Sequence, residues 1–576
     1  MSNLLKSKHI LSVLLFAILF FVVFLFSLFQ INPAIDSGRE FWLSYRVLNG
    51  EVLYKDIFNI YGPLAYQINA CVYAILGDSV NSLRIFGSFN ASLIMFAVGF
   101  ILREFFENSR KHLIWCLLWL CPLITGVFYI GIFNFTVPYS FAMSYGLCFF
   151  LFALLFFIKF VKSNNNSFLF FAAFFAGGSA VCKYEFMLCL LFFLIYISFA
   201  LKNNKKIFLS AVLVTLIIPL ISFGDLFLRG LSFNDLINTF KIQKTMTETD
   251  AIKYFYNNFT GAYFNLKIFG YCLLKTALLG ILTILFYFAD KFYGKDKVLF
   301  TVTIIFILSG IFYVGFGVFS LFAVIHMILF LFYVKKIFQN KPLFLLMSSI
   351  IILSLKTFFA VNYDVYGTYV LPFIVISLGV FIYTFDFGFD DDVKKRVKKT
   401  FVIILISLLL MSVFRTVSGV FSKINGGIVV EPIKNPKNIF EKIRKTVYTY
   451  PNIAKALNET KYFITENTSP DDIVVILPET QFLNFITKRP ADNLYDSITP
   501  LYTETFGEEN IISHFKKTRP DYFILNSRDT SDYGKRYLCE DYGQELCKFI
   551  KKDYEKIKEI RENNYKLQIY RRADKK

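Results

Sequence analysis

Long apolar runs are the feature that most restricts what this chain can fold into. Ile207–Ser222 and Phe401–Val413 contain no charged residue and are long enough to form a membrane span or most of one. Of all residues, 56% are hydrophobic and only 18% are charged, whereas a soluble domain is roughly half apolar and a quarter charged. Similar runs recur from the N-terminus to Phe421, so the sequence predicts a polytopic membrane protein.

Thirteen apolar runs are predicted to be helical spans. Several of them are short or closely spaced, which leaves a count of eleven or twelve open. The first follows Lys6 and Lys8, as in a signal peptide, but it is too long for one and no small-residue cleavage site follows, so we expect an uncleaved anchor. The predicted spans are approximately 9–31, 84–104, 112–132, 137–160, 167–181, 185–201, 206–223, 267–289, 298–317, 319–334, 343–360, 367–384 and 400–421.

The charges of the loops predict the orientation. With the N-terminus in the cytosol, the inner side carries 21 Lys and Arg residues, whereas the short outer loops near 133, 183, 318 and 363 carry only Lys183. This asymmetry agrees with the positive-inside rule, and an odd number of spans places everything after Phe421 outside. The net charge of +19 therefore belongs mainly to inner loops and does not indicate nucleic acid as a partner.

The sequence divides into two predicted domains. Residues 1–421 form an all-α membrane domain with longer outer loops at 32–83 and 224–266, and residues 422–576 form a small extracytoplasmic α/β domain. In the second domain we expect strands at Ile473–Leu477, Tyr522–Leu525 and Tyr565–Tyr570, with helices at 508–517 and 537–556.

Two of the nine cysteines, Cys539 and Cys547, lie in this polar C-terminal part. A disulfide between them is compatible with a location outside the cytosol. On one straight helix, however, two residues eight positions apart are too distant to be bridged. The sequence leaves the bridge open.

An ordered set of residues follows the first span, in the stretch that begins DSGREFW. It consists of Asp36, Asn49–Gly50, Tyr54 with Asp56, Pro63–Leu64, Gly77 with Ser79, and Arg84. In this order the stretch resembles the GT-C superfamily of membrane glycosyltransferases, which includes protein O-mannosyltransferases and the lipid A aminoarabinose transferase. The match covers about 50 residues, and the span count with a C-terminal outer domain extends it loosely to the whole chain.

The resemblance implies a GT-C fold and an integral membrane glycosyltransferase of the plasma (inner) membrane. Such an enzyme transfers a sugar from a polyprenyl-phosphate donor to a lipid, glycan or protein acceptor at the outer face, with inversion. Two positions depart from the family pattern. Tyr61–Gly62 stands where lipid A-modifying members have a Lys before the "PPL", and Ser37 stands where some members have a second carboxylate.

The chemistry of such a transfer points to the same stretch. A carboxylate must take the proton of the acceptor hydroxyl, and cations must stabilise the departing phosphate. Asp36 and Arg39 lie three residues apart, on one helical face, directly beyond the membrane. We therefore assign Asp36 as the catalytic base and Arg39 to the donor phosphate, against the alternative of a simple interfacial salt bridge. Glu40 is a secondary acid, and Asp56 is as consistent with fixing a turn near Phe58 and Asn59 as with function.

Lysines near the outer ends of later spans are further candidates for the donor phosphate. Lys183 and Lys356 are assigned to it, and Lys275 is similarly placed. The alternative is that these side chains extend to the membrane interface. Asp364 is a candidate partner of Lys356. The tyrosines at 363, 366 and 369 are interpreted as an interfacial aromatic belt.

The sequence does not decide whether a metal takes part. Asp390 and Asp392 form a DxD sequence, but they lie in a basic inner loop with no nucleotide-binding fold and are interpreted as solvated. The four histidines are too scattered for a histidine-based site, and a divalent ion held by carboxylates near Asp36 stays open. Two alternative functions are also kept: an O-antigen-type polymerase or ligase, and a lipid or solute transporter, for which no internal repeat is seen.

Overall fold

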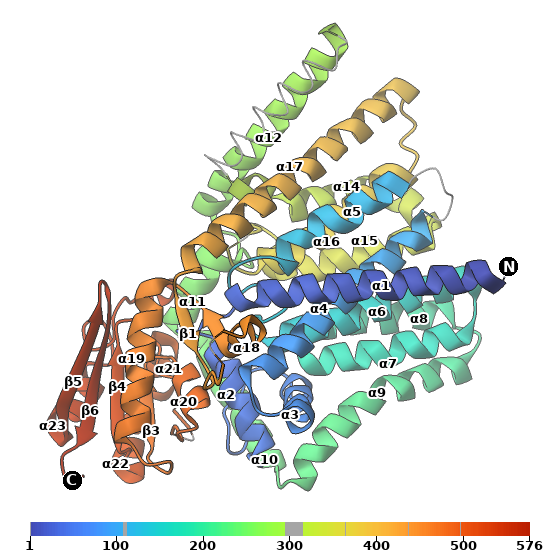
Figure 1. Ribbon diagram of the computed structural model, residues 1–576. Coiled ribbons are helices and arrows are strands. Elements are labelled where there is room, and N and C mark those ends of the chain that lie inside the picture. The colour runs from blue at the N-terminus through green and yellow to red at the C-terminus, as the bar shows by residue number, and fades with distance from the viewer. Residues whose placement is uncertain are drawn as a thin grey trace.

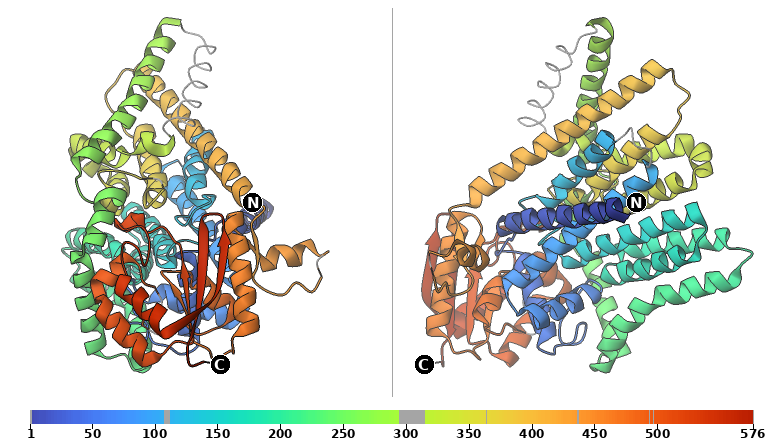
Figure 2. Two further views of the ribbon diagram at one scale, coloured as in Figure 1. Left: turned by 90° about the vertical axis from the view of Figure 1, so that its left-hand side faces the viewer. Right: turned by 45° about the vertical axis from the view of Figure 1, so that its right-hand side comes forward.

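The protein is a bundle of helices with a small α/β part at one end (Figure 1). The structure, a computed structural model, describes residues 2–106, 112–293, 315–362, 364–435, 437–492, 494–495 and 497–575. Ser2 lies at one end of the bundle, and the C-terminal sheet lies at the other (Figures 1 and 2).

Helices occur at twelve of the thirteen predicted spans. The remaining span, 298–317, lies largely outside the described residues. These helices are α1 (Ser2–Phe26), α4 (Val80–Phe105), α5 (His112–Val127), α6 (Phe141–Ser163), α7 (Asn166–Cys182), α8 (Glu185–Ala200), α9 (Lys205–Leu228), α12 (Leu266–Tyr293), α14 (Phe322–Gln339), α15 (Lys341–Ser354), α16 (Gly367–Thr384) and α17 (Asp391–Lys423).

By length and composition, six helical segments of the described chain can cross a membrane. They are Val80–Phe105, Phe141–Ser163, Lys205–Leu228, Gly317–Gln339, Gly367–Thr384 and Asp391–Lys423. Shorter apolar helices, among them Asn166–Cys182 and Glu185–Ala200, pack beside them. The protein is therefore a mostly helical, multi-pass membrane protein, and the count of thirteen spans stays a prediction.

The two longer loops that the sequence predicts to be outside fold into helices that lie at the same end of the bundle as the α/β part (Figure 1). The first contains α2 (Ser37–Leu48) and α3 (Leu64–Leu76). The second contains α10 (Phe233–Glu248), α11 (Asp250–Phe255) and the π-helical turn η3 (Tyr256–Thr260). This end of the molecule therefore gathers all three segments that the sequence assigns to the outside.

The C-terminal part contains a four-stranded sheet in the order β3-β4-β6-β5. Strand β3 (Val474–Leu477) pairs in parallel with β4 (Tyr522–Asn526), and β6 (Tyr565–Arg572) runs antiparallel to β4 and to β5 (Tyr554–Glu562). The three predicted strands are confirmed. The helices of this part are α18 (Ile439–Lys445), α19 (Pro451–Asn467), α20 (Phe482–Thr487), α21 (Pro500–Phe506), α22 (Glu508–Thr518) and α23 (Gln544–Asp553), and a short ribbon pairs β1 (Gly427–Val429) with β2 (Thr446–Tyr448).

The predicted helix at 537–556 is wrong at both ends. Helix α23 covers only Gln544–Asp553, and strand β5 begins directly after it. The strand pairing shifts between Lys556 and Lys558, which breaks the alternation of buried and exposed side chains that reveals a strand in a sequence. A bridge joins Cys539 to Cys547, because Cys539 lies in a turn before the helix and the two Cα atoms are 5.5 Å apart.

We predict that the α/β end faces outward. Cysteines introduced singly at two exposed positions test this orientation: Glu466, at the end of α19, and Asn203, in the predicted inner loop. In spheroplasts, a membrane-impermeant maleimide should label Glu466→Cys directly and Asn203→Cys only after permeabilisation, with the unmodified protein as background. The reverse pattern would refute both the orientation and a site at the outer face.

Candidate active site

Asp36, Arg39 and Glu40 lie together at the start of α2. Asp36 is the residue that precedes the helix, and a guanidinium nitrogen of Arg39 lies 3.2 Å from its carboxylate and 3.9 Å from that of Glu40. The side chains of Arg39 and Asp36 keep 18% and 23% of their surface exposed, whereas Glu40 is fully buried. The predicted pair therefore exists, and it remains reachable for a ligand.

Both carboxylate oxygens of Glu40 are already occupied. One accepts a hydrogen bond of 2.9 Å from the Tyr66 hydroxyl on α3, and the other accepts one of 2.8 Å from the backbone N–H of Phe141. Phe141 begins α6, so the carboxylate sits at the positive end of that helix. Burial raises the pKa of Glu40 to about 7, and Arg39 and these two hydrogen bonds oppose that rise. Glu40 thus joins α2, α3 and α6 and positions Asp36.

Lys183 and Lys356 meet at one carboxylate that the sequence analysis missed. Lys183 follows α7, and Lys356 lies in the short 3-10 helix η6 (Leu355–Thr357). The ammonium of Lys183 lies 3.2 Å from the carboxylate of Glu185, and that of Lys356 contacts the other oxygen of the same group. Both ammonium groups are therefore paired within the protein.

Tyrosine rings surround the two lysines. The Lys183 ammonium lies 5.0–5.6 Å from the ring centres of Tyr61, Tyr139 and Tyr366, and that of Lys356 lies 3.8 Å from the centre of Tyr366. The predicted aromatic belt is wrong for Tyr369, which is fully buried and donates a hydrogen bond to the Asn134 carbonyl, whereas it stays a prediction for Tyr366. Tyr363 lies outside the described residues.

Tyr61 connects the lysines with α2. The backbone N–H of Gly62 donates to the Cys182 carbonyl, and a Cβ atom at Gly62 would lie 1.7 Å from the Val181 oxygen, so only glycine fits there. This contact holds Tyr61 beside Lys183. Burial raises the pKa of Tyr61 well above its usual value, and the charges of Arg39 and Lys356 oppose that rise. The contacts agree: the Lys183 ammonium lies beside the rings of Tyr61 and Tyr139, and Phe141, two residues after Tyr139, donates to Glu40 at the start of α2, so the lysines and α2 belong to one site.

The C-terminal part closes this site with residues that the sequence analysis also missed. Thr480 donates a hydrogen bond of 3.0 Å to the Ala34 carbonyl, directly before α2. The carboxylate of the adjacent Glu479 lies 2.5 Å from the Arg528 guanidinium, which also pairs with Asp532. Burial raises the pKa of Glu479 to about 7; Arg528 opposes this rise and Asp36 adds to it.

Charged residues from both the membrane domain and the C-terminal part affect the pKa of Asp36. Burial raises the pKa of its carboxyl above the usual value. The positive charges of Arg39 and Arg528 oppose this rise, and the negative charge of Asp532 adds to it. A carboxylate with a raised pKa is a stronger base, which suits the removal of a proton from a hydroxyl.

Other candidates lie elsewhere. Asp56 accepts a hydrogen bond of 2.9 Å from the Val52 N–H and so closes a turn within its own loop, toward Val52 and not toward Phe58 or Asn59. Asp364 pairs with Arg415 at 2.6 Å, so its predicted pairing with Lys356 is wrong. Within the described ranges, no three His, Cys, Asp or Glu side chains group as a metal site, and a divalent ion near Asp36 stays a prediction.

Comparison with known proteins gives a fold but no sequence relative. Neither a protein-family model nor a curated protein sequence matches the chain. The solved structure of ArnT from Cupriavidus metallidurans bound to undecaprenyl phosphate is similar, with a TM-score of 0.51 and 12% identity over 97% of this chain and 98% of that one. The apo form of the same protein has a TM-score of 0.49 and 11% identity over 98% of each chain. The similarity to the first structure shows that this chain has the fold of ArnT.

Proposed function

We propose that the protein is a membrane glycosyltransferase that moves a sugar from a polyprenyl-phosphate donor to an acceptor hydroxyl at the outer face of the membrane. One observation carries this proposal: a carboxylate of raised pKa, Asp36, shares a largely buried site with Arg39, Lys183 and Lys356 at the predicted outer end of the helices. The bound undecaprenyl phosphate of the similar structure supports the class of donor.

The reaction is a single displacement with inversion at the sugar. Asp36 accepts the proton of the acceptor hydroxyl while the oxygen of that hydroxyl forms a bond to the anomeric carbon. The bond from that carbon to the phosphate oxygen breaks, and the electron pair leaves with the polyprenyl phosphate. The negative charge that develops on the phosphate is stabilised by Arg39, whose planar guanidinium binds two oxygens, and by Lys183 and Lys356.

Glu185 keeps the two lysines in place while the site is empty. It holds both ammonium groups near one point, although like charges repel each other. An incoming phosphate competes with Glu185 for these groups. The similarity to ArnT extends over nearly the whole chain, including the C-terminal α/β part, and supports this function over an O-antigen-type polymerase or ligase and over a transporter.

Native mass spectrometry of the purified protein tests the donor class. We expect a co-purified polyprenyl phosphate or its glycoside, and we expect Lys356→Ala to lower its occupancy about tenfold, since one charge-assisted contact is worth about 1.4 kcal/mol or more. Lys244→Ala, an exposed lysine on α10, is the matched control and should retain the lipid. A lipid-free wild type, or equal occupancy in both variants, would count against the proposal.

A further inference from the structure

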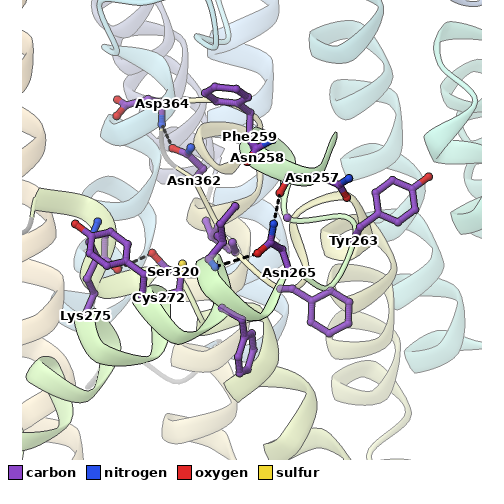
Figure 3. A pocket seen from close by; sticks show the side chains of 18 of the residues that line it. Asn257, Asn258, Phe259, Tyr263, Asn265, Cys272, Lys275, Ser320, Asn362 and Asp364 are labelled. Carbon is purple, nitrogen blue, oxygen red and sulfur yellow. Dashed lines mark hydrogen bonds between the residues drawn. The ribbon is translucent and has the colours of Figure 1, made fainter. Parts of the chain in front are cut away.

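A cavity shares walls with the candidate active site, and Figure 3 shows side chains that line it. It measures about 310 Å³ and is bounded by η3, the start of α12, the 3-10 helix η5 (Gly315–Phe319) with Ser320, and the loop after Lys356. The function proposed above does not use it.

The lining of this cavity is rich in groups that both donate and accept hydrogen bonds. Four asparagines contribute to it, together with Tyr263 and Ser320; the asparagines are Asn257, Asn258, Asn265 and Asn362. The Asn257 amide and the Tyr263 hydroxyl form no side-chain hydrogen bond within the described part of the chain. Each sugar hydroxyl also donates and accepts, so such a lining is matched to a polyhydroxylated ligand.

One lysine gives the cavity a positive charge. The ammonium of Lys275 lies 4.2 Å from the centre of the Tyr271 ring and makes no ion pair with any residue that the structure describes. Gly317 leaves room for it, because a Cβ atom at that position would lie 3.0 Å from the ammonium nitrogen. The other charged lining residues, Asp364 and Arg415, neutralise each other at 2.6 Å.

The walls of the cavity are shared with the donor site. Tyr256 contacts the Lys356 ammonium with its ring, at 5.9 Å from the ring centre, while the next residue, Asn257, faces the cavity. Likewise, Lys356 belongs to the donor site, and Phe359 and Asn362 from the same loop line the cavity. The backbone N–H of Phe359 donates to the Gly261 carbonyl, which joins the two segments into one wall.

From this arrangement we infer that the cavity is a subsite for the acceptor and binds a sugar that carries a negative charge, such as a carboxylate or a phosphate. The inference rests on the proposed function. The transferred sugar is bonded to the donor phosphate and so lies with Asp36 and Arg39, on the other side of the wall. A sugar in the cavity therefore belongs to the second substrate, which makes the acceptor a glycan or a glycolipid.

Binding of small sugars to the purified full-length protein tests this inference. By ligand-observed NMR, glucose 6-phosphate should bind about five- to tenfold more tightly than glucose, because only the first engages Lys275. Lys275→Gln should abolish this difference, and Asn257→Ala should weaken both ligands. Lys267→Gln, an exposed lysine on the same helix outside the cavity, is the matched control.

Three results would overturn the inference: equal binding of the two sugars to the wild type, an unchanged preference in Lys275→Gln, or inorganic phosphate bound as tightly as glucose 6-phosphate. Co-purified polyprenyl phosphate is measured in the same preparations. Its loss in Lys275→Gln would assign the cavity to the donor. If the polyprenyl phosphate were retained and the variants did not change sugar binding, the subsite would be refuted and the proposed function would be unaffected.

Discussion

Asp36→Asn should lower the rate of sugar transfer by about 10²–10⁴-fold, the contribution of a positioned general base. The amide keeps the shape of the carboxylate but does not accept the proton of the acceptor hydroxyl. Glu40 does not replace it, because both of its oxygens are engaged by Tyr66 and Phe141. Donor binding should persist, since the cationic groups of Arg39, Lys183 and Lys356 remain.

The informative measurement is the transfer rate and the donor occupancy in one preparation of Asp36→Asn. Asp250→Asn makes the same chemical change at an exposed position of the second predicted outer loop, and it should leave both quantities unchanged. If Asp36→Asn retained transfer, the base would have to be sought at Glu479, a buried carboxyl group of the C-terminal part whose pKa is raised by burial and by the charge of Asp36. If the variant did not accumulate, the Asp36–Arg39 pair would be structural.

The sequence predicts those contacts of the site that join residues close to each other in the chain. Asp36 directly precedes α2 and Arg39 lies in its first turn, three residues later, so the short spacing in the sequence is enough to bring the two side chains together. The lysines could be selected because a charge at the outer end of a span is unusual in membrane helices. What they pair with could not be predicted in the same way, because Glu185 lies 171 positions before Lys356 and the contact depends on how α8 packs against η6.

The residues from the C-terminal part were missed because their position depends on strand pairing. Glu479 follows β3 and Arg528 follows β4, and these strands are parallel neighbours. The carboxyl ends of parallel neighbours lie at the same edge of a sheet, where functional groups commonly collect. The sequence contained a usable signal: two buried strands, each followed within three residues by a charged side chain. The hydrogen bond from Thr480 to the Ala34 carbonyl and the packing of Phe41 on Phe482 bring this edge to the start of α2, and the sequence does not reveal either contact.

The second large effect is expected at Arg39. Replacing it by Gln removes a cation aimed at the departing phosphate, and loss of one such preorganised group lowers the turnover by about 10²–10³-fold. Lys at this position retains the charge but not the planar pair of donors, so Arg39→Lys should recover only part of the activity.

Arg39→Gln should also change the pH dependence of the residual activity. Asp36 must be deprotonated to act as a base, so the rate falls as the pH decreases through its pKa. Among the charged neighbours, Arg39 makes the largest contribution to lowering that pKa. Without it the pKa rises further, and the acid limb of the rate profile should move to higher pH in Arg39→Gln, with a smaller shift in Arg39→Lys. Lys241→Gln, at an exposed position of α10, provides the control profile. If the pH profile of Arg39→Gln coincided with that of the wild type, Arg39 would have no effect on the pKa of Asp36, and its role would be limited to the local fold.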